Sequence, residues 1–302
     1  MRRTTIWTGI IAAGACALVA TTGLWAPTIR AQAPAAADAA FRLKAFATHR
    51  AMAQTSPYKA LTWQPIGPAN NTGRMTSIAV SDVAGKRTIY VGAATGGVWK
   101  SEDRGDSWKP IFEQEATSSI GDVAVAPSNA NIVWVGTGED NLFRAGIAGT
   151  GIYKSTDAGA TWTHMGLTDT GTIGRVLVHP TSPDVVYVAA SGHEWTSNAD
   201  RGVYKTSDGG KTWNKVFFRS AKTGAIDLVM DPSDPNTLYA AMCQRVRRLW
   251  SDPRVEPGDN EGGIWKTTDA GKTWTAVNDG LPAPEFRGRI GVDISRSHPN
   301  VV

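Results

Sequence analysis

The segment Ser155-Thr-Asp157-Ala-Gly159-Ala-Thr161-Trp162 decides the fold, because the chain of 302 residues contains its pattern four times. We call each copy a box. The other three occupy residues 101–108, 206–213 and 267–274, and successive box aspartates are 54, 51 and 61 residues apart. Repetition at such a period is typical of stacked supersecondary units. A catalytic group is not needed four times, so the pattern predicts a structural unit.

The residue types of a box suit a hairpin turn. Short Ser, Thr and Asp side chains accept hydrogen bonds from turn N–H groups, and the glycine adopts a backbone conformation with positive φ. The tryptophan packs its large surface against neighbouring structure. We therefore expect structural roles for the box aspartates and tryptophans, namely Asp103, Trp108, Asp157, Trp162, Asp208, Trp213, Asp269 and Trp274.

Each box stands in a longer unit of four expected strands. A Gly-x-aromatic-Lys strand precedes every box, as in Gly151-Ile-Tyr153-Lys154, and two β-branched strands precede that one. The box turn leads into a fourth strand. Four antiparallel strands per unit are typical of a β-propeller blade, so we predict an all-β propeller. The predicted blades cover residues 74–113, 118–167, 172–218, 224–278 and, in part, 287–302, where Ile290, Val292 and Ile294 alternate as an innermost strand. The incomplete fifth blade suggests the N-terminal part of a larger propeller, whose remaining blades would be partners; a partner chain that closes the ring is the alternative.

The N-terminus predicts export. Residues 1–33 combine Arg2 and Arg3 with an apolar run and the small-residue exit Ala31-Gln-Ala33, as a secretory signal peptide does. Residues 34–60 form an Ala-rich linker in which Ala39 to Met52 is expected to be a short amphipathic helix, while residues 61–302 form the propeller. We expect a periplasmic or extracellular protein with no membrane span after cleavage, because no second apolar run of sufficient length follows.

Charge and cysteine content narrow the function. The net charge is +4, but the first 33 residues hold three arginines and no acidic residue, so the remainder is nearly neutral. Nucleic-acid binding is therefore not expected. Only Cys243 remains after cleavage, which excludes an intramolecular disulfide. No metal-ligand spacing and no phosphate-binding glycine loop occurs, so no metal or cofactor is predicted.

The boxes resemble the Asp-box, or bacterial neuraminidase repeat. Together with Trp99-Lys100 and Gly288 to Val292, they resemble exported bacterial propellers of the sortilin/Vps10-like and "glycosyl hydrolase, BNR repeat" group. The resemblance implies a propeller over residues 61 to 302. It does not fix an activity, because Asp-boxes occur in sialidases, xyloglucan-cleaving glycosidases, assembly factors and sortilin receptors.

The resemblance allows two catalytic patterns to be tested. A sialidase would need an arginine triad; Arg74 lies in the first inner strand, but no Arg-Ile-Pro segment is present. The xyloglucan-cleaving family resembles the segment Ala93-Ala-Thr-Gly-Gly97-Val-Trp-Lys100, and its motif has a catalytic aspartate where this chain has Ala94. Glycoside hydrolysis depends on a pair of carboxylates, and the family's second acid would lie beyond residue 302. If the protein is an enzyme, we expect a glycoside hydrolase, but Ala94 lacks the carboxylate that this mechanism needs at its position.

The loops between the second and third strands vary from blade to blade, and such loops usually carry function. They offer three acids as weak catalytic candidates, Glu139, Asp140 and Glu194, although each also suits a turn. They also offer five candidate ligand-binding residues: His193, Trp195, Arg245, Arg248 and Trp250. Aromatic side chains flanked by acids and arginines suit sugar rings, and Trp and Arg equally suit a protein partner.

Adjacent inner strands carry alternating charge, with Asp122, Arg175 and Asp227 at one level. We expect these three side chains to pair and to fix the register between blades.

Two functions remain open. One is a glycosidase-like propeller that binds carbohydrate or another ligand, and the other is a sortilin-like peptide-binding or assembly scaffold without catalysis.

Overall fold

The computed structural model describes residues 38–61, 74–141, 146–244 and 260–302. They contain one long helix, two 3-10 turns and four sheets. The helix is α2 (Ala39–Thr55), and the turns are η1 (Thr168–Thr170) and η2 (Pro284–Phe286). The first two sheets consist of β1 (Met75–Val83), β2 (Lys86–Ala93), β3 (Gly97–Ser101) and β4 (Lys109–Pro110), then β5 (Ile120–Ala126), β6 (Asn129–Thr137), β7 (Ile152–Ser155) and β8 (Thr163–His164). The third and fourth consist of β9 (Ile173–Val178), β10 (Val186–Ala190), β11 (Gly202–Thr206) and β12 (Asn214–Phe217), then β13 (Thr223–Met230), β14 (Leu238–Gln244), β15 (Gly263–Thr267) and β16 (Thr275–Ala276).

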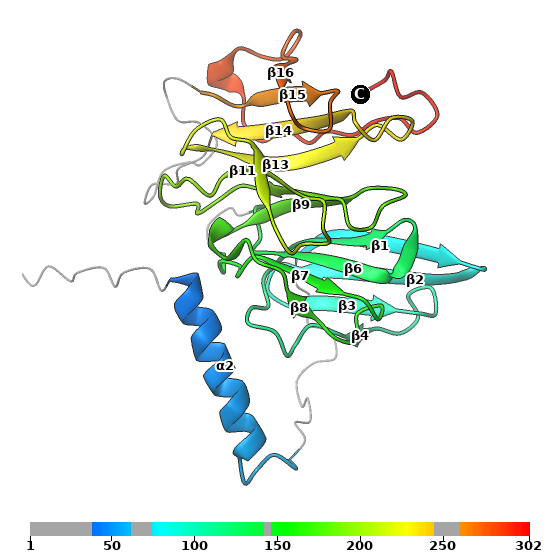
Figure 1. Cartoon of the computed structure of the whole chain (residues 1–302), viewed down its shortest axis with the longest axis vertical. Helices are drawn as coiled ribbons and strands as arrows, with labels where there is room; N and C mark the ends of the chain where they lie inside the picture. The colour runs from blue at the N-terminus through cyan, green and yellow to red at the C-terminus, as the bar shows by residue number, and fades with distance from the viewer. Residues whose placement is uncertain (1–37, 62–73, 142–145, 245–259) are drawn as a thin grey trace, which may run out of the picture. The chain divides into compact units, whose positions relative to one another are not determined.

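Each sheet is an antiparallel meander of four strands in chain order. The first strands β1, β5, β9 and β13 lie next to one another, so successive sheets stack face to face (Figure 1). Three clusters of buried apolar side chains fill the spaces between consecutive sheets. This arrangement confirms the predicted all-β architecture and is that of a partial β-propeller.

Two sequence-based expectations are corrected. The fourth strands, expected for example over residues 161–165 and 212–217, start only after the box tryptophan: β4, β8 and β16 have two residues each and β12 has four. Residues 288–294 do not form a strand, since no neighbouring strand pairs with them in the described residues. Ile290 and Val292 still pack against the fourth sheet, at Ile226 and Cys243.

The lysine of every Gly-x-aromatic-Lys strand lies over an aromatic ring of the adjacent second strand. The four pairs, with their distances from Nζ to ring centroid, are Lys100 and Tyr90 (5.8 Å), Lys154 and Trp134 (4.9 Å), Lys205 and Tyr187 (5.0 Å), and Lys266 and Tyr239 (5.2 Å). These groups also reach the next sheet: Tyr187 Oη and Lys205 Nζ both donate to the carbonyl oxygen of Ala270, at 3.1 and 3.0 Å. Ala270 has the left-handed φ of 59°, which turns its carbonyl toward the preceding sheet. Lys154 Nζ likewise donates to the carbonyl of Gly209 at 3.3 Å, so the lysines of the second and third sheets each join their sheet to the box of the next.

Every box closes on its aspartate in the same way. In the second box, Asp157 Oδ1 accepts from Thr161 N at 2.8 Å and from Ser155 Oγ at 2.7 Å, and Oδ2 accepts from Thr161 Oγ1 at 2.6 Å. The tryptophan fixes the neighbouring sheet, because Trp162 Nε1 donates to the carbonyl of Ile111 at 2.7 Å. These contacts give the aspartate a structural part in the turn.

The box aspartates make the free energy of unfolding depend on pH. Hydrogen bonds from the Thr161 side chain, the Thr161 N–H and Ser155 lower the pKa of Asp157 to about 2. A folded-state pKa below the unfolded value gives a contribution that is present above about pH 4 and is lost as pH falls toward 2. We expect Asp157→Asn to lower the free energy of unfolding at pH 7, with a smaller difference from wild type at pH 2.5. Urea unfolding at both pH values measures this.

The control for that comparison is Asp106→Asn, at a variable position of the first box. It should leave stability nearly unchanged at both pH values. A deficit of Asp157→Asn that is equally large at pH 7 and pH 2.5 would contradict the assignment.

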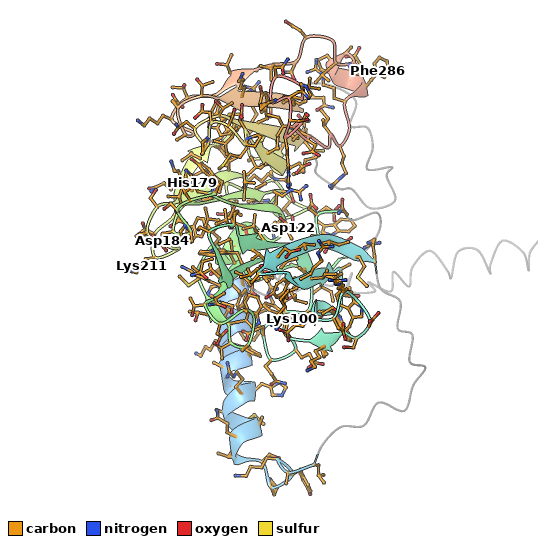
Figure 2. All side chains as sticks on the ribbon, turned by 90° about the vertical axis from the view of Figure 1, so that its right-hand side faces the viewer. Lys100, Asp122, His179, Asp184, Lys211 and Phe286 are labelled. Carbon is orange, nitrogen blue, oxygen red and sulfur yellow. The ribbon has the colours of Figure 1, made fainter. Side chains whose placement is uncertain are left out.

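The expected pairing of Asp122, Arg175 and Asp227 across the inner strands forms, and we call these three side chains the charged level. Arg175 Nε donates to Asp227 Oδ1 at 2.7 Å, and its Nη1 lies 3.9 Å from Asp122 Oδ1. Asp122, within the stack of sheets in Figure 2, also accepts from Val176 N at 2.7 Å. Asp227 accepts in the same way from Val292 N at 3.1 Å. Each carboxylate therefore ties its own sheet to the inner strand or segment that follows.

The helix α2 buries only part of the expected apolar face. Ala39 is buried and Leu43 and Phe46 are half-buried, whereas Phe41 is 63% exposed. The helix is also bound through Arg42, whose two terminal nitrogens donate to the carbonyls of Ala148 and Gly149 at 2.8 Å each. It therefore contacts the loop between β6 and β7 of the second sheet. Within the described ranges, no helix is long and apolar enough to cross a membrane.

Candidate ligand-binding face

The loops between second and third strands lie at one end of the sheets, opposite the box turns. We call this end the loop face. It carries all the predicted site residues that the structure describes: Glu139, Asp140, His193, Glu194 and Trp195. Arg245, Arg248 and Trp250 lie outside the described residues, as do residues 1–37 with the predicted signal peptide.

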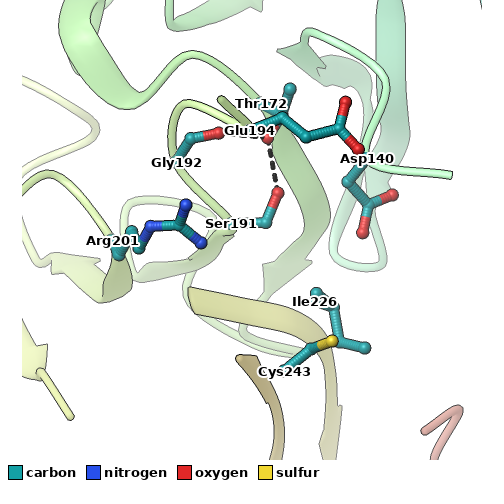
Figure 3. A pocket seen from close by; sticks show the side chains of 8 residues that line it. All are labelled: Asp140, Thr172, Ser191, Gly192, Glu194, Arg201, Ile226 and Cys243. Atoms are coloured by element: carbon teal, nitrogen blue, oxygen red, sulfur yellow. Dashed lines mark hydrogen bonds between the residues drawn. The ribbon is translucent and has the colours of Figure 1, made fainter. Parts of the chain in front are cut away.

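The structure brings Asp140 and Glu194 to one small pocket, from loops of the second and third sheets (Figure 3). Its lining also includes Arg201 and Cys243, and the hydroxyls of Thr172 and Ser191 lie 2.5 Å apart at its edge. The cavity holds about 10 Å³, which is room for one water molecule at most. It is a polar gap below the loop face and not a cleft for a sugar ring.

Glu139 is an ion-pair partner between sheets. Its side chain is 1% exposed, and its two carboxylate oxygens accept from Arg74 Nε and Nη2 at 2.5 Å each. This pairing raises the pKa of Arg74, mainly through the hydrogen bond from its side chain. A guanidinium that holds both oxygens of a carboxylate is a strong and geometrically specific contact. The geometry therefore makes Glu139 a link between the second sheet and Arg74, the residue directly before β1.

Asp140 binds a second arginine from far along the chain. Arg289 Nη2 lies 3.1 Å from Asp140 Oδ2, and Nη1 donates to the Asp140 carbonyl. The same Nη2 donates to Asn141 Oδ1 at 2.7 Å. The segment after the fourth sheet is thus tied to the second sheet, and the Asp140 side chain is 2% exposed.

Trp195 is the predicted site residue that faces outward. Its side chain is 49% exposed, whereas Glu194 beside it is 9% exposed. His193 is half-buried against Gly171, and its backbone carbonyl is a hydrogen-bond acceptor within the loop. The loop face therefore offers an indole surface with polar groups around it, an arrangement that suits stacking on a sugar ring or on an apolar peptide side chain.

The resemblance described above implies that Ala94 takes the place of the aspartate in the xyloglucan-cleaving motif. It is 3% exposed, and its N–H donates to the carbonyl of Arg74 at 2.9 Å. The position supplies a methyl group and no carboxylate.

Among the described residues, no three His, Cys, Asp or Glu side chains cluster in a way that could hold a metal ion.

A comparison with protein-family models identifies the family of this chain. The Sortilin-Vps10 family model, described as "Sortilin, neurotensin receptor 3,", matches residues 150–300. The chain belongs to the Sortilin-Vps10 family. The match covers the third and fourth sheets and, on the loop face, the loop of residues 191–201.

This Sortilin-Vps10 chain is also similar to glycosidases. It is 26% identical over 290 residues to Xyloglucanase Xgh74A of Acetivibrio thermocellus, covering 89% of this chain and 30% of the relative. It is 26% identical over 249 residues to a xyloglucanase of a Paenibacillus species, covering 72% and 22%. The chain thus spans less than a third of the length of these relatives.

Solved structures support the fold of the Sortilin-Vps10 chain. An ancestral GH74 enzyme aligns with a TM-score of 0.54 at 22% identity, over 72% of this chain and 25% of that one. A GH74 enzyme of Niastella koreensis aligns with a TM-score of 0.51 at 23% identity, over 69% and 30%. Both place the four sheets within a propeller fold.

Sequence reasoning missed the arginines that hold the loop face together, Arg74, Arg201 and Arg289. Arg74 stands out in the sequence only as an arginine of the first inner strand, and Arg289 only as part of Gly288 to Val292. Their partners lie 65 and 149 residues away, so no local pattern marks the pairs. Arg201 directly precedes a Gly-x-aromatic-Lys strand, and this position was the one available signal.

Proposed function

We propose that this protein is an exported propeller of glycosidase-like type that binds a β-glucan of the xyloglucan class on its loop face. The observation that carries the proposal is the outward Trp195 on a loop of a chain similar to xyloglucanases. Aromatic platforms with nearby polar groups are suited to pyranose rings, whose apolar faces stack on indole. Export rests on the signal-like residues 1–33.

Binding without hydrolysis is the second part of this proposal. On the described loop face, Ala94 stands at the position that the resemblance gives to the first catalytic acid of the xyloglucan-cleaving family. Glu139 and Asp140 are each paired with an arginine. Retaining and inverting glycosidases both need two carboxylates positioned at the scissile bond. We therefore propose that this chain by itself recognises the polysaccharide and does not cleave it.

The test is a glycan array and a hydrolysis assay on the full chain and on Trp195→Ala. We expect the wild type to bind xyloglucan oligosaccharides without releasing reducing sugar. Loss of one stacking aromatic is expected to weaken binding about tenfold, which corresponds to about 1.4 kcal/mol. Trp108→Ala is the matched control, because Trp108 is 38% exposed at the box end of the first sheet. Equal affinities of Trp195→Ala and wild type would overturn the proposed site.

A second candidate function is peptide binding. The family match over residues 150–300 favours it, because the matched segment includes Trp195 and the loop 191–201. Capture of peptides from a random library, with no signal on the glycan array, would support this function in place of the first.

A further blade is the proposed protein partner. Ile78 on β1 is 67% exposed, whereas Val123 at the equivalent position of β5 is 3% exposed against the first sheet. Trp162 bonds to the preceding sheet at Ile111, whereas Trp108 Nε1 donates to its own Gly105. The open face of the first sheet thus repeats the surface by which the second sheet packs, and we propose that another box-bearing blade covers it.

A further inference from the structure

A nearly inaccessible arginine lies beneath the candidate ligand platform. Arg201 is 1% exposed and ends the loop 191–201, which joins β10 to β11. Burying a guanidinium is costly unless its donors are satisfied, so its contacts are informative. Figure 3 shows its guanidinium within the lining of the small pocket.

The guanidinium of Arg201 holds two backbone carbonyls of its own loop. Nη2 donates to the carbonyl of His193 at 2.7 Å and to that of Thr196 at 3.3 Å. Asn198 Nδ2 donates to the same two carbonyls, at 3.2 and 3.1 Å. One arginine and one asparagine thus form a clamp on the same pair of acceptors.

The clamped carbonyls flank the dipeptide Glu194-Trp195. Because the chain is held on both sides of this dipeptide, its two side chains have little freedom in direction. Glu194 is turned inward at 9% exposure and Trp195 outward at 49%. The clamp therefore holds the backbone from which the indole projects.

The loop 191–201 also packs closely on Arg201 and is hydrogen-bonded to neighbouring segments of the chain. Gly192 has a φ of +83°, and a Cβ at this position would lie 2.4 Å from Arg201 Cγ, so the arginine stem packs directly on the glycine backbone. Asn198 N donates to the carbonyl of Ala221 at 2.9 Å, and Ser191 N donates to that of Thr172 at 3.1 Å. The base of the platform is thus bound on both sides before any ligand arrives.

From this geometry we infer that Arg201 is a positioning residue that pre-organises Trp195 for stacking on a sugar ring; the inference rests on the proposed function. A preformed platform avoids the cost of ordering a loop on binding. Lysine at this position keeps the positive charge, but its ammonium ends one bond short of the Nη2 position that reaches both carbonyls. Arg201→Lys should therefore affect the platform and retain the charge.

The experiment uses the full chain labelled with 5-fluorotryptophan, with the Trp195 resonance assigned from Trp195→Phe. We expect Arg201→Lys to shift or broaden the ¹⁹F resonance of Trp195 and to weaken binding of a xyloglucan oligosaccharide about tenfold by calorimetry. In the Trp195→Ala background, the same substitution should cause no further loss. A general loss of stability would not produce this non-additivity.

The controls separate the two assignments. Arg87→Lys, at an exposed arginine of the first sheet, should change neither the ¹⁹F resonance nor the affinity. An unchanged Trp195 resonance in Arg201→Lys, or an equal loss of affinity with and without Trp195, would overturn the positioning role. If Trp195→Ala binds normally, the proposed site fails, and the resonance alone then decides whether Arg201 holds the loop. Should Arg201→Lys fail to fold, Asn198→Ala loosens the same two carbonyls and is judged by the same readouts.

Discussion

Replacing Arg175 by methionine is expected to lower the free energy of unfolding by about 2–3 kcal/mol, because it leaves two inward carboxylates without their cation. Asp122 is 4% and Asp227 13% exposed, whereas Arg175 is 41% exposed, so the expected loss lies below that of a fully buried pair. Urea unfolding of the full chain measures it.

The loss in Arg175→Met should also depend on pH. Burial raises the pKa of Asp122 to about 6, and Arg175 opposes that rise. A pKa raised above the unfolded value means stability that is present below about pH 4 and is lost as pH rises through about 6. Without Arg175 the pKa of Asp122 rises further, so we expect a larger deficit at pH 8 than at pH 5.

Arg87→Met is the matched control for Arg175→Met. It breaks the ion pair with Asp82 at 3.0 Å, in which both side chains are about half exposed, and should cost less than about 1 kcal/mol. If both variants lose the same amount, or if the deficit of Arg175→Met does not change with pH, the charged level does not connect the sheets as described.

Gly121→Ala is expected to be the most damaging single substitution at the centre of the stack, costing more than about 3 kcal/mol or preventing folding. Gly121 is the bulge residue of β5, between Ile120 and Asp122. An added Cβ would lie 1.8 Å from the carbonyl oxygen of Ile173 and 2.6 Å from that of Gly138. Both obstacles are backbone atoms, so no side-chain rotation relieves the overlap. The yield of soluble protein and the unfolding midpoint measure the effect.

Two other glycines, at which an added Cβ would meet less obstruction, provide a graded comparison for Gly121→Ala. At Gly136 the closest atom to an added Cβ is the Ile173 side-chain Cγ2 at 2.4 Å, which can move, so Gly136→Ala should cost less. At Gly291 the nearest atom lies 3.9 Å away, and Gly291→Ala should be nearly neutral. A different order among the three variants would contradict close backbone approach as the reason for glycine at 121.

The repeats allowed the fold to be predicted, because their information is local. The box turn, the Gly-x-aromatic-Lys strand and the β-branched strands each have a pattern within a few residues, and their fourfold recurrence implies stacking. The alternation of Asp122, Arg175 and Asp227 was predictable for the same reason, since equivalent positions of a repeat lie at the same level. Alternation alone did not make residues 288–294 a strand, because no strand of the described ranges pairs with them.

The candidate site was predictable only in part. Variable loops on a regular scaffold indicated where to look, and Trp195 lies there with its indole exposed. The acids beside it were attractive as catalytic candidates only while their partners were unknown. Glu139 and Asp140 are bound by Arg74 and Arg289, which come from distant parts of the chain.

The sequence by itself determined the repeating sheet, because turn chemistry and strand alternation act over a few neighbouring residues. It also determined that Ala94 supplies no carboxylate. Only the tertiary structure decided which side chains reach the surface of the loop face and which are held below it. Ion pairs such as Arg289 with Asp140, and the clamp of Arg201 on two carbonyls, depend on distances between loops that stacking alone sets.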